Sequence, residues 1–171
     1  WKAFAQRVRA PSLLIFLALG MWPETVRQNA VAAGPDSGAW RPGHYTAWLV
    51  YGLLQQGKYA DAARHLAVMR GNLAAQPTAG RQSYILSMRA HYLINTEEWT
   101  SPAGGWAIEA PLAVPGTRAI DAYALGVAHL AQGRRLQAEQ ALARIDSLAR
   151  TAQGDNIYGA NTAVPGILAD Q

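Results

Sequence analysis

Four turn signals recur along this chain at nearly equal intervals, each between two apolar helical stripes. They fall at positions 20, 57, 97 and 133, which are separated by 37, 40 and 36 residues. Three of these positions are glycine. Glu97 is aligned by its flank, because Trp99 follows it at the offset where Tyr59 follows Gly57. One hairpin of two amphipathic helices cannot bury both apolar faces, so such units stack on neighbours of the same kind. The spacing therefore predicts an all-α fold built from repeated helix pairs.

The predicted helices form four pairs separated by connectors rich in Pro and Gly. We expect one domain with approximate repeats over 5–33, 44–72, 80–110 and 118–151, and a tail or cap over 152–171. The second helix of the third repeat, near 98–110, should be short or broken, because prolines and glycines interrupt "TSPAGGWAIEAPLAVPG". The other helices are expected near 5–19, 22–33, 44–56, 59–72, 80–95, 118–132 and 135–151.

The fourth unit has small residues at the positions where its two helices should cross. Gly126 precedes the turn at Gly133 and Ala138 follows it, and larger side chains there would force the helix axes apart. This pattern resembles the tetratricopeptide repeat, a pair of antiparallel helices of about 34 residues. The resemblance implies a right-handed solenoid of about four hairpins, with the third degenerate.

Three motifs extend the resemblance to one group of proteins. In chain order, "RAPSLLIFLALGMW", "YGLLQQGKYADA" and "MRAHYLINTEEW" are similar to the C-terminal part of a group of long bacterial tetratricopeptide-repeat proteins, which is known mainly as scaffolding. In that group histidines accompany the Pro-Ser of the first motif. In this chain the neighbours of Pro11-Ser12 are Arg9, Ala10, Leu13 and Leu14, so any role of those histidines is not carried over.

The first helix of each pair lines the inner wall of a solenoid, where extended partners bind. The residues that the register places there are rich in Tyr, His and amide side chains, which combine apolar bodies with polar tips and suit a peptide. The alternative is that these side chains only fill the space between helix pairs. The candidate partner-binding residues are Arg7, Leu14, His44, Tyr51, Gln55, Tyr84, Ser87, His91, Asn95 and Tyr123.

The sequence predicts that some tryptophans belong to the core and that one could be exposed. Trp22 and Trp99 stand at the turn offset of the repeat and should be core residues. Trp106 lies in the Gly- and Pro-rich insert, where the repeat pattern requires no aromatic residue. It is therefore a candidate exposed anchor for a partner, with packing inside the loop as the alternative.

Several function classes find no support in the sequence. His44 and His91 are the histidines expected in the groove, but no two histidines have the four-residue helical spacing of a metal pair, so we expect no metal and no cofactor. Catalytic motifs such as H-E-x-x-H and G-x-S-x-G are absent, which favours a protein that is not an enzyme. The net charge of +4 comes from scattered arginines, which disfavours a nucleic-acid partner. With no cysteine, disulfides and zinc–thiolate sites are excluded, while the compartment stays open.

The start of the chain is apolar. The run from Leu13 to Met21 is too short to span a bilayer and is expected to be a buried helix rather than a signal peptide. Since the sequence opens on Trp1, we expect a processed or partial chain.

We also expect the tail to cover an uncovered face of the last helix, using apolar side chains such as Ile157 and Leu168. That face should carry Leu142, Ile145 and Leu148.

These features favour a non-catalytic scaffold that binds a protein or peptide of unknown identity in the groove. A self-assembling subunit that uses the solenoid end and the tail stays open, because 50% hydrophobic and 15% charged residues suit burial against other copies. A small-ligand pocket near Trp99 to Trp106 is a third interpretation.

Overall fold

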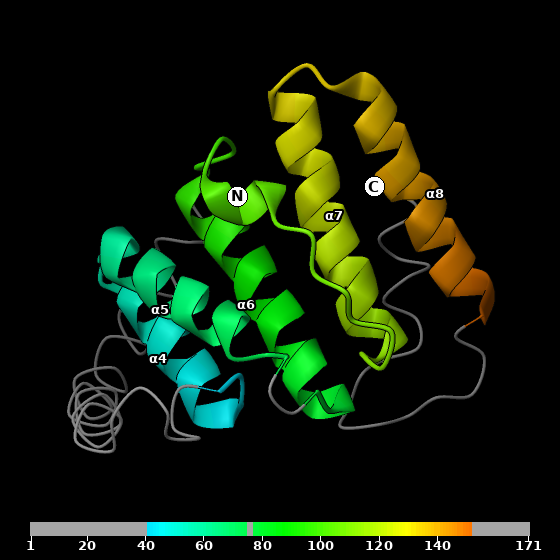
Figure 1. Ribbon diagram of the computed structural model, residues 1–171. Coiled ribbons are helices and arrows are strands. Elements are labelled where there is room, and N and C mark those ends of the chain that lie inside the picture. Colours follow the sequence, from blue (N-terminus) through cyan, green and yellow to red (C-terminus); the bar gives the residue numbers. More distant parts are fainter. Residues whose placement is uncertain (1–40, 75–76, 152–171) are drawn as a thin grey trace, which may run out of the picture.

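The computed structural model of the protein describes residues 41–74 and 77–151, and within these ranges all regular structure is helical. The described part of the chain is therefore all-α, as the periodicity predicts. Arg7, Leu14, the expected turn at Gly20 and the tail over 152–171 lie outside the described residues. The elements are α4 (His44–Gln55), α5 (Tyr59–Gly71), α6 (Ala79–Thr96), the short 3-10 helix η2 (Pro102–Gly105), α7 (Pro115–Ala131) and α8 (Arg135–Thr151) (Figure 1).

The described turns share one backbone conformation. Gly57 and Gly133 have φ values of 71° and 69°, and Glu97, at the equivalent position of the third unit, has a φ of 55°. This left-handed conformation costs nothing for glycine but is unfavourable for a residue with a Cβ. After each glycine the next amide donates to a carbonyl in the last turn of the preceding helix, from Lys58 to Leu53 and from Arg134 to His129, each at 2.9 Å. Such bonds end a helix and reverse the chain.

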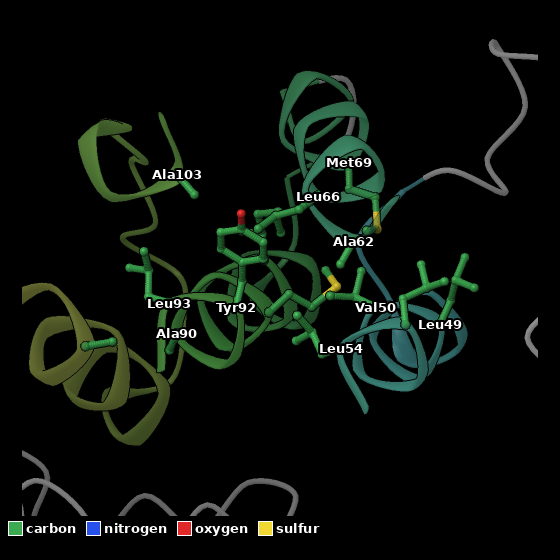
Figure 2. Close-up of a cluster of buried hydrophobic side chains, with 14 of the residues drawn as sticks. Leu49, Val50, Leu54, Ala62, Leu66, Met69, Ala90, Tyr92, Leu93 and Ala103 are labelled. Atoms are coloured by element: carbon green, nitrogen blue, oxygen red, sulfur yellow. The ribbon is translucent and has the colours of Figure 1, made fainter. Parts of the chain in front are cut away.

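The main core lies between α4, α5 and α6. Val50 of α4, Leu66 of α5 and Leu93 of α6 are each at most 1% exposed, and the ring of Tyr92 lies among them (Figure 2). Ala62 of α5 is fully buried, and its small side chain lets α5 approach its neighbours closely. Each large side chain buried here contributes about 1.5–3 kcal/mol, so these three helices form one packed unit.

Helices α7 and α8 also pack closely. A Cβ atom on Gly126 would lie only 3.3 Å from the Cβ of Ala141, so glycine is needed where the two helices cross. The sequence pattern singled out Ala138 for this crossing. Ala138 is buried, but the residue that faces Gly126 lies one turn further along α8, because an antiparallel partner at this distance from the turn at Gly133 is Ala141.

Where the sequence predicts the second helix of a third pair, the structure has η2 and an irregular segment over 106–114. Side chains of α6 bind the backbone of this segment. The amide of Leu112 donates to Gln82 Oε1 at 2.7 Å, and the amide of Val114 donates to Ser83 Oγ at 3.1 Å. These bonds satisfy backbone groups that a helix would have paired internally. The segment therefore depends on α6 for its conformation.

Helices α4, α6 and α7 lie side by side and run in the same direction (Figure 1). Contacts between α6 and the chain leading into α7 show the direction, because Ser83 meets Val114 and, further along both, Arg89 meets Asp121. Residue numbers rise together on the two sides, which is the signature of parallel neighbours. Helices α4, α6 and α7 thus form one parallel layer.

The apolar face predicted for α8 is buried in part. Ile145 and Leu148 are 3% and 5% exposed, whereas Leu142 is 46% exposed. Helix α8 packs closely on α7. That the tail covers this face stays a prediction, because residues 152–171 lie outside the described residues.

Candidate functional site

Six of the predicted groove residues form three side-chain pairs between α4 and α6. The ring centroids of His44 and Tyr84 lie 6.4 Å apart, and those of Tyr51 and His91 lie 6.1 Å apart. The Nε2 of Gln55 donates to Oδ1 of Asn95 at 3.4 Å. Every pair is 40 residues apart in sequence, the same spacing that separates turn positions 57 and 97. We call these six residues the ladder face.

Helical periodicity explains why these residues align. His44, Tyr51 and Gln55 are spaced by seven and four residues, which places them on one side of α4. Val50 and Leu54 point to another side and are buried in the core. The ladder face is thus the more exposed side of these helices. Its histidines and amides are exposed, whereas Tyr51 and Tyr84 are half-buried and Tyr84 also packs against the main core.

Exposed aromatic rings extend the ladder face at the start of α4. Trp48 Nε1 donates to His44 Nε2 at 3.1 Å, and the ring centroid of Tyr45 lies 5.6 Å from that of His44. Tyr45 is 58% exposed and Trp48 is 46% exposed. The sequence pattern did not single out either residue, although Trp48 stands four residues after His44, on the same side of the helix. Together they offer an apolar surface with polar tips.

His91 carries a lowered pKa within the ladder. Desolvation by its neighbours lowers the pKa of this imidazole below its ordinary value of 6.5, while part of the residue remains exposed. A neutral imidazole can donate one hydrogen bond and accept another. His91 is therefore suited to bind a peptide group at neutral pH.

Of the remaining candidates, Ser87 and Tyr123 are half-buried on α6 and α7. Tyr123 belongs to a row on α7 with spacings of three and four residues, which is partly open to solvent. The side of α7 that carries the half-buried Leu125 packs against the main core, so this row faces away from that core. We call the row the α7 stripe, and its members are Ile120, Tyr123, Val127 and Leu130.

Trp106 does not protrude as an anchor. It is half-buried and packs against the main core, and the guanidinium carbon of Arg70 lies 5.0 Å from the centre of its ring. Its carbonyl oxygen accepts a hydrogen bond from Arg89 Nη1 at 2.7 Å. Packing within the loop is thus what the structure shows for Trp106. Trp99 is likewise half-buried against the core, as expected for a turn-position aromatic.

A buried ion pair between α6 and α7 was not anticipated from the sequence. Arg89 Nε and Nη2 donate to the two carboxylate oxygens of Asp121 at 2.7 and 2.6 Å, and the side chains are 3% and 1% exposed. Burial raises the pKa of Asp121, and the hydrogen bonds and charge of Arg89 oppose that rise. The only signal in the sequence is a charged residue inside an apolar run, as in "SMRAHYL" and "AIDAYAL". The pair joins the two helices and lies away from the ladder face.

Acidic side chains are unevenly distributed among the helices. Helices α4 and α6 contain no Asp or Glu, and the one acidic residue of α7, Asp121, is buried. Carboxylates occur instead on α5 and α8 and in the connecting segments. The ladder face and the α7 stripe therefore lie on helices that present no negative side chain to solvent.

An open cleft lies where α6 ends. It has a volume of about 540 Å³, and its lining includes Trp99, Ser101 and Gln132. The hydroxyl of Tyr92 donates to the carboxylate of Glu98 at its wall, and burial together with this carboxylate raises the pKa of Tyr92 to about 12. Trp106 is not among the residues that line it. The expectation of a closed cavity between Trp99 and Trp106 is therefore replaced by an open cleft beside Trp99.

Within residues 41–74 and 77–151, no three His, Cys, Asp or Glu side chains are grouped so that they could hold a metal ion. None of the helices described there has the length and apolar character needed to cross a membrane. No protein-family model matches the chain, and neither a curated protein nor a solved structure matches it. The function is therefore inferred from the geometry.

Proposed function

We propose that this protein is a non-catalytic scaffold that binds an extended peptide, or an extended segment of a partner protein, along the ladder face. The observation that carries the proposal is the row of three side-chain pairs, continued by the exposed rings of Tyr45 and Trp48. Aromatic rings bury a large area while losing little side-chain entropy, and the amides of Gln55 and Asn95 can pair with a peptide backbone. These are the ingredients of a peptide-binding surface.

The proposal includes a solenoid of the tetratricopeptide-repeat kind. Its support is the parallel layer formed by α4, α6 and α7, the constant offset of 40 residues in the ladder, and the left-handed residue at each described turn. In stacked helix pairs the first helices together form the surface on which partners bind. The ladder face belongs to this layer.

The charge pattern defines the partner further. Because the helices of the layer expose no carboxylate, a basic segment would find no ion-pair partner there. Apolar and aromatic side chains accompanied by acidic or neutral polar residues fit the surface best. A mildly acidic segment is also favoured by the net charge of +4 on the chain.

A peptide-display selection on the full chain tests this function, with each selected peptide resynthesised and titrated by fluorescence anisotropy. The variant Tyr51→Ala/His91→Ala removes the central pair of the ladder, and Kd should rise by about tenfold or more, since central anchors dominate such surfaces. Tyr59→Ala is the matched control, because Tyr59 is 37% exposed on α5 and outside the ladder. Peptides that bind the ladder variant and the original chain equally would rule out this site.

A second candidate is a self-assembling subunit. It is favoured by three exposed leucines at the α7–α8 end, Leu130, Leu136 and Leu142, which are 62%, 64% and 46% exposed. Scattered apolar residues occur on monomers, but exposed leucines on the last described helix pair are available for contact with a second copy. Sedimentation across a dilution series distinguishes the two functions. Growth in size with concentration that Leu136→Glu abolishes supports assembly, and a monomer at all concentrations excludes it.

A further inference from the structure

We propose that residues 152–171 of this chain fold back on the α7 stripe, where they act as a built-in competitor for the outside partner. The inference rests on the proposed function, because it extends the same binding layer from α4 and α6 to α7. The occupant is a segment of the chain itself, and three observations select it: where α8 ends, which apolar surface is free, and how charge is distributed.

The position of the end of α8 brings this segment to the stripe. The turn at Gly133 joins α7 to α8, and the two helices pack along each other as an antiparallel pair of equal length (Figure 1). Thr151 therefore lies beside the first turn of α7, one to two turns before Ile120. The stripe from Ile120 to Leu130 is about 15 Å long at the helical rise of 1.5 Å per residue. Twenty further residues, able to span about 3.3 Å each, can reach all of it.

The apolar surfaces that remain exposed point to the same place. Ile145 and Leu148 are buried, and the exposed leucines of α8, Leu136 and Leu142, are six residues apart and therefore lie on different sides of the helix, so α8 offers the segment no continuous apolar row. On α7, by contrast, Ile120 is 36% exposed and Leu130 is 62% exposed, with Tyr123 and Val127 between them half-buried. The segment supplies matching apolar side chains in two groups, which are Ile157 with Tyr158 and Val164 with Ile167 and Leu168.

Charge agrees with this pairing. Residues 152–171 contain Asp155 and Asp170 and no Lys or Arg. The exposed surface of α7 contains no carboxylate, since Asp121 is buried against Arg89. An acidic, apolar segment is also the chemistry that the layer favours for an outside partner, so a partner that extends from the ladder face onto α7 would compete with the segment for the stripe.

The absence of cysteine makes a direct test possible in the full chain. A nitroxide on Ala163→Cys will broaden the amide signals of nearby residues in an NMR spectrum. The signals of Tyr123 and Val127 should lose most of their intensity, and that of Arg64 on α5 should keep it. The loss should be unchanged on dilution. Val127→Asp should restore the Tyr123 signal, whereas Leu136→Asp, an exposed position on α8, should not.

Each other outcome overturns the inference. Full intensity at Tyr123 and Val127 means that the segment does not occupy the stripe, and a loss that disappears on dilution means that a second copy does. Broadening that survives Val127→Asp places the segment elsewhere. No outside partner is present in this measurement. It can therefore show docking of the segment when the display selection finds no peptide, and it can show no docking when the selection does find one. The failure of one proposal is thereby distinguished from the failure of the other.

Discussion

Arg89 on α6 and Asp121 on α7 form two parallel hydrogen bonds across the boundary between their helices, and neither residue is more than 2% exposed. A third bond from Arg89, to the carbonyl of Trp106, joins the irregular segment to the same boundary. A planar guanidinium is well suited to this arrangement, because its N–H groups point in fixed directions. One side chain thus connects three consecutive parts of the fold.

Loss of one partner in this pair should be strongly destabilising. Asp121→Ala leaves the guanidinium of Arg89 buried without its counter-charge, and we expect a loss of about 3–5 kcal/mol in the free energy of unfolding. Chemical denaturation measures it. The control is Glu139→Ala, which removes the exposed pair with Arg135 and should change stability by less than about 1 kcal/mol. The double replacement Arg89→Met/Asp121→Leu should lose less than the single one, and equal losses would show that charge is not the cause.

Gly126 tests the close approach of α7 and α8. Gly126→Leu adds a side chain where even a Cβ would be 3.3 Å from Ala141, and overpacking of this kind costs about 1–3 kcal/mol. Gly80→Ala is the matched control, because a Cβ there meets nothing within 4 Å, and replacing a helical glycine gains about 0.5–1 kcal/mol. Thermal unfolding reports both changes. Stabilisation by both substitutions would contradict the observed crossing.

The left-handed turn positions predict two opposite effects. Gly133→Ala meets no atom within 4 Å, yet its φ of 69° makes a Cβ unfavourable, so we expect a loss of about 1–2 kcal/mol. Glu97→Gly relieves the same strain at a φ of 55° and should stabilise the protein by up to about 1 kcal/mol, less the extra chain entropy of glycine. Urea denaturation of the two variants checks the signs, and a stabilising Gly133→Ala would refute the explanation.

Tyr92 predicts a loss of stability in alkali. Its pKa is raised from 10.0 to about 12 in the folded protein, so its contribution is fully present below pH 10 and is lost as the pH rises through 12. A shift of this size corresponds to about 2–3 kcal/mol. Tyr92→Phe should be slightly less stable at pH 8 and should lose less stability than the original chain between pH 10 and 12. Equal slopes for the two proteins would show that another group titrates.

The sequence predicted the helices and turns where apolar stripes and turn residues recur at nearly equal spacing. The offset of 40 residues aligned Glu97 with Gly57, and the helical register placed all six ladder residues among the predicted groove residues. Their position on one surface could therefore be anticipated, whereas their pairing between α4 and α6 was not predicted. Binding of a partner there could not be anticipated either, since a row of Tyr, His and amide side chains is also compatible with simple packing.

Features that depend on a single contact between residues distant in the sequence were not predictable. Arg89 and Asp121 are 32 residues apart, and each interrupts an apolar run without indicating which residue it meets. The irregular segment has no period, because side chains of Gln82 and Ser83 take the place of its own backbone partners. Trp106 was for the same reason considered as an anchor, although its ring closes the core beside Arg70.

The irregular segment over 106–114 also affects how such a protein could change its length. A stack of similar helix pairs can gain or lose a whole pair, since every boundary presents the same surface to the next. The boundary between α6 and α7 is different, because Gln82, Ser83 and Arg89 bind the connecting chain itself. If the pairs stack as proposed, a duplicated pair inserted there would have to replace these contacts. We therefore expect whole units to be gained or lost less readily between α6 and α7 than between α5 and α6.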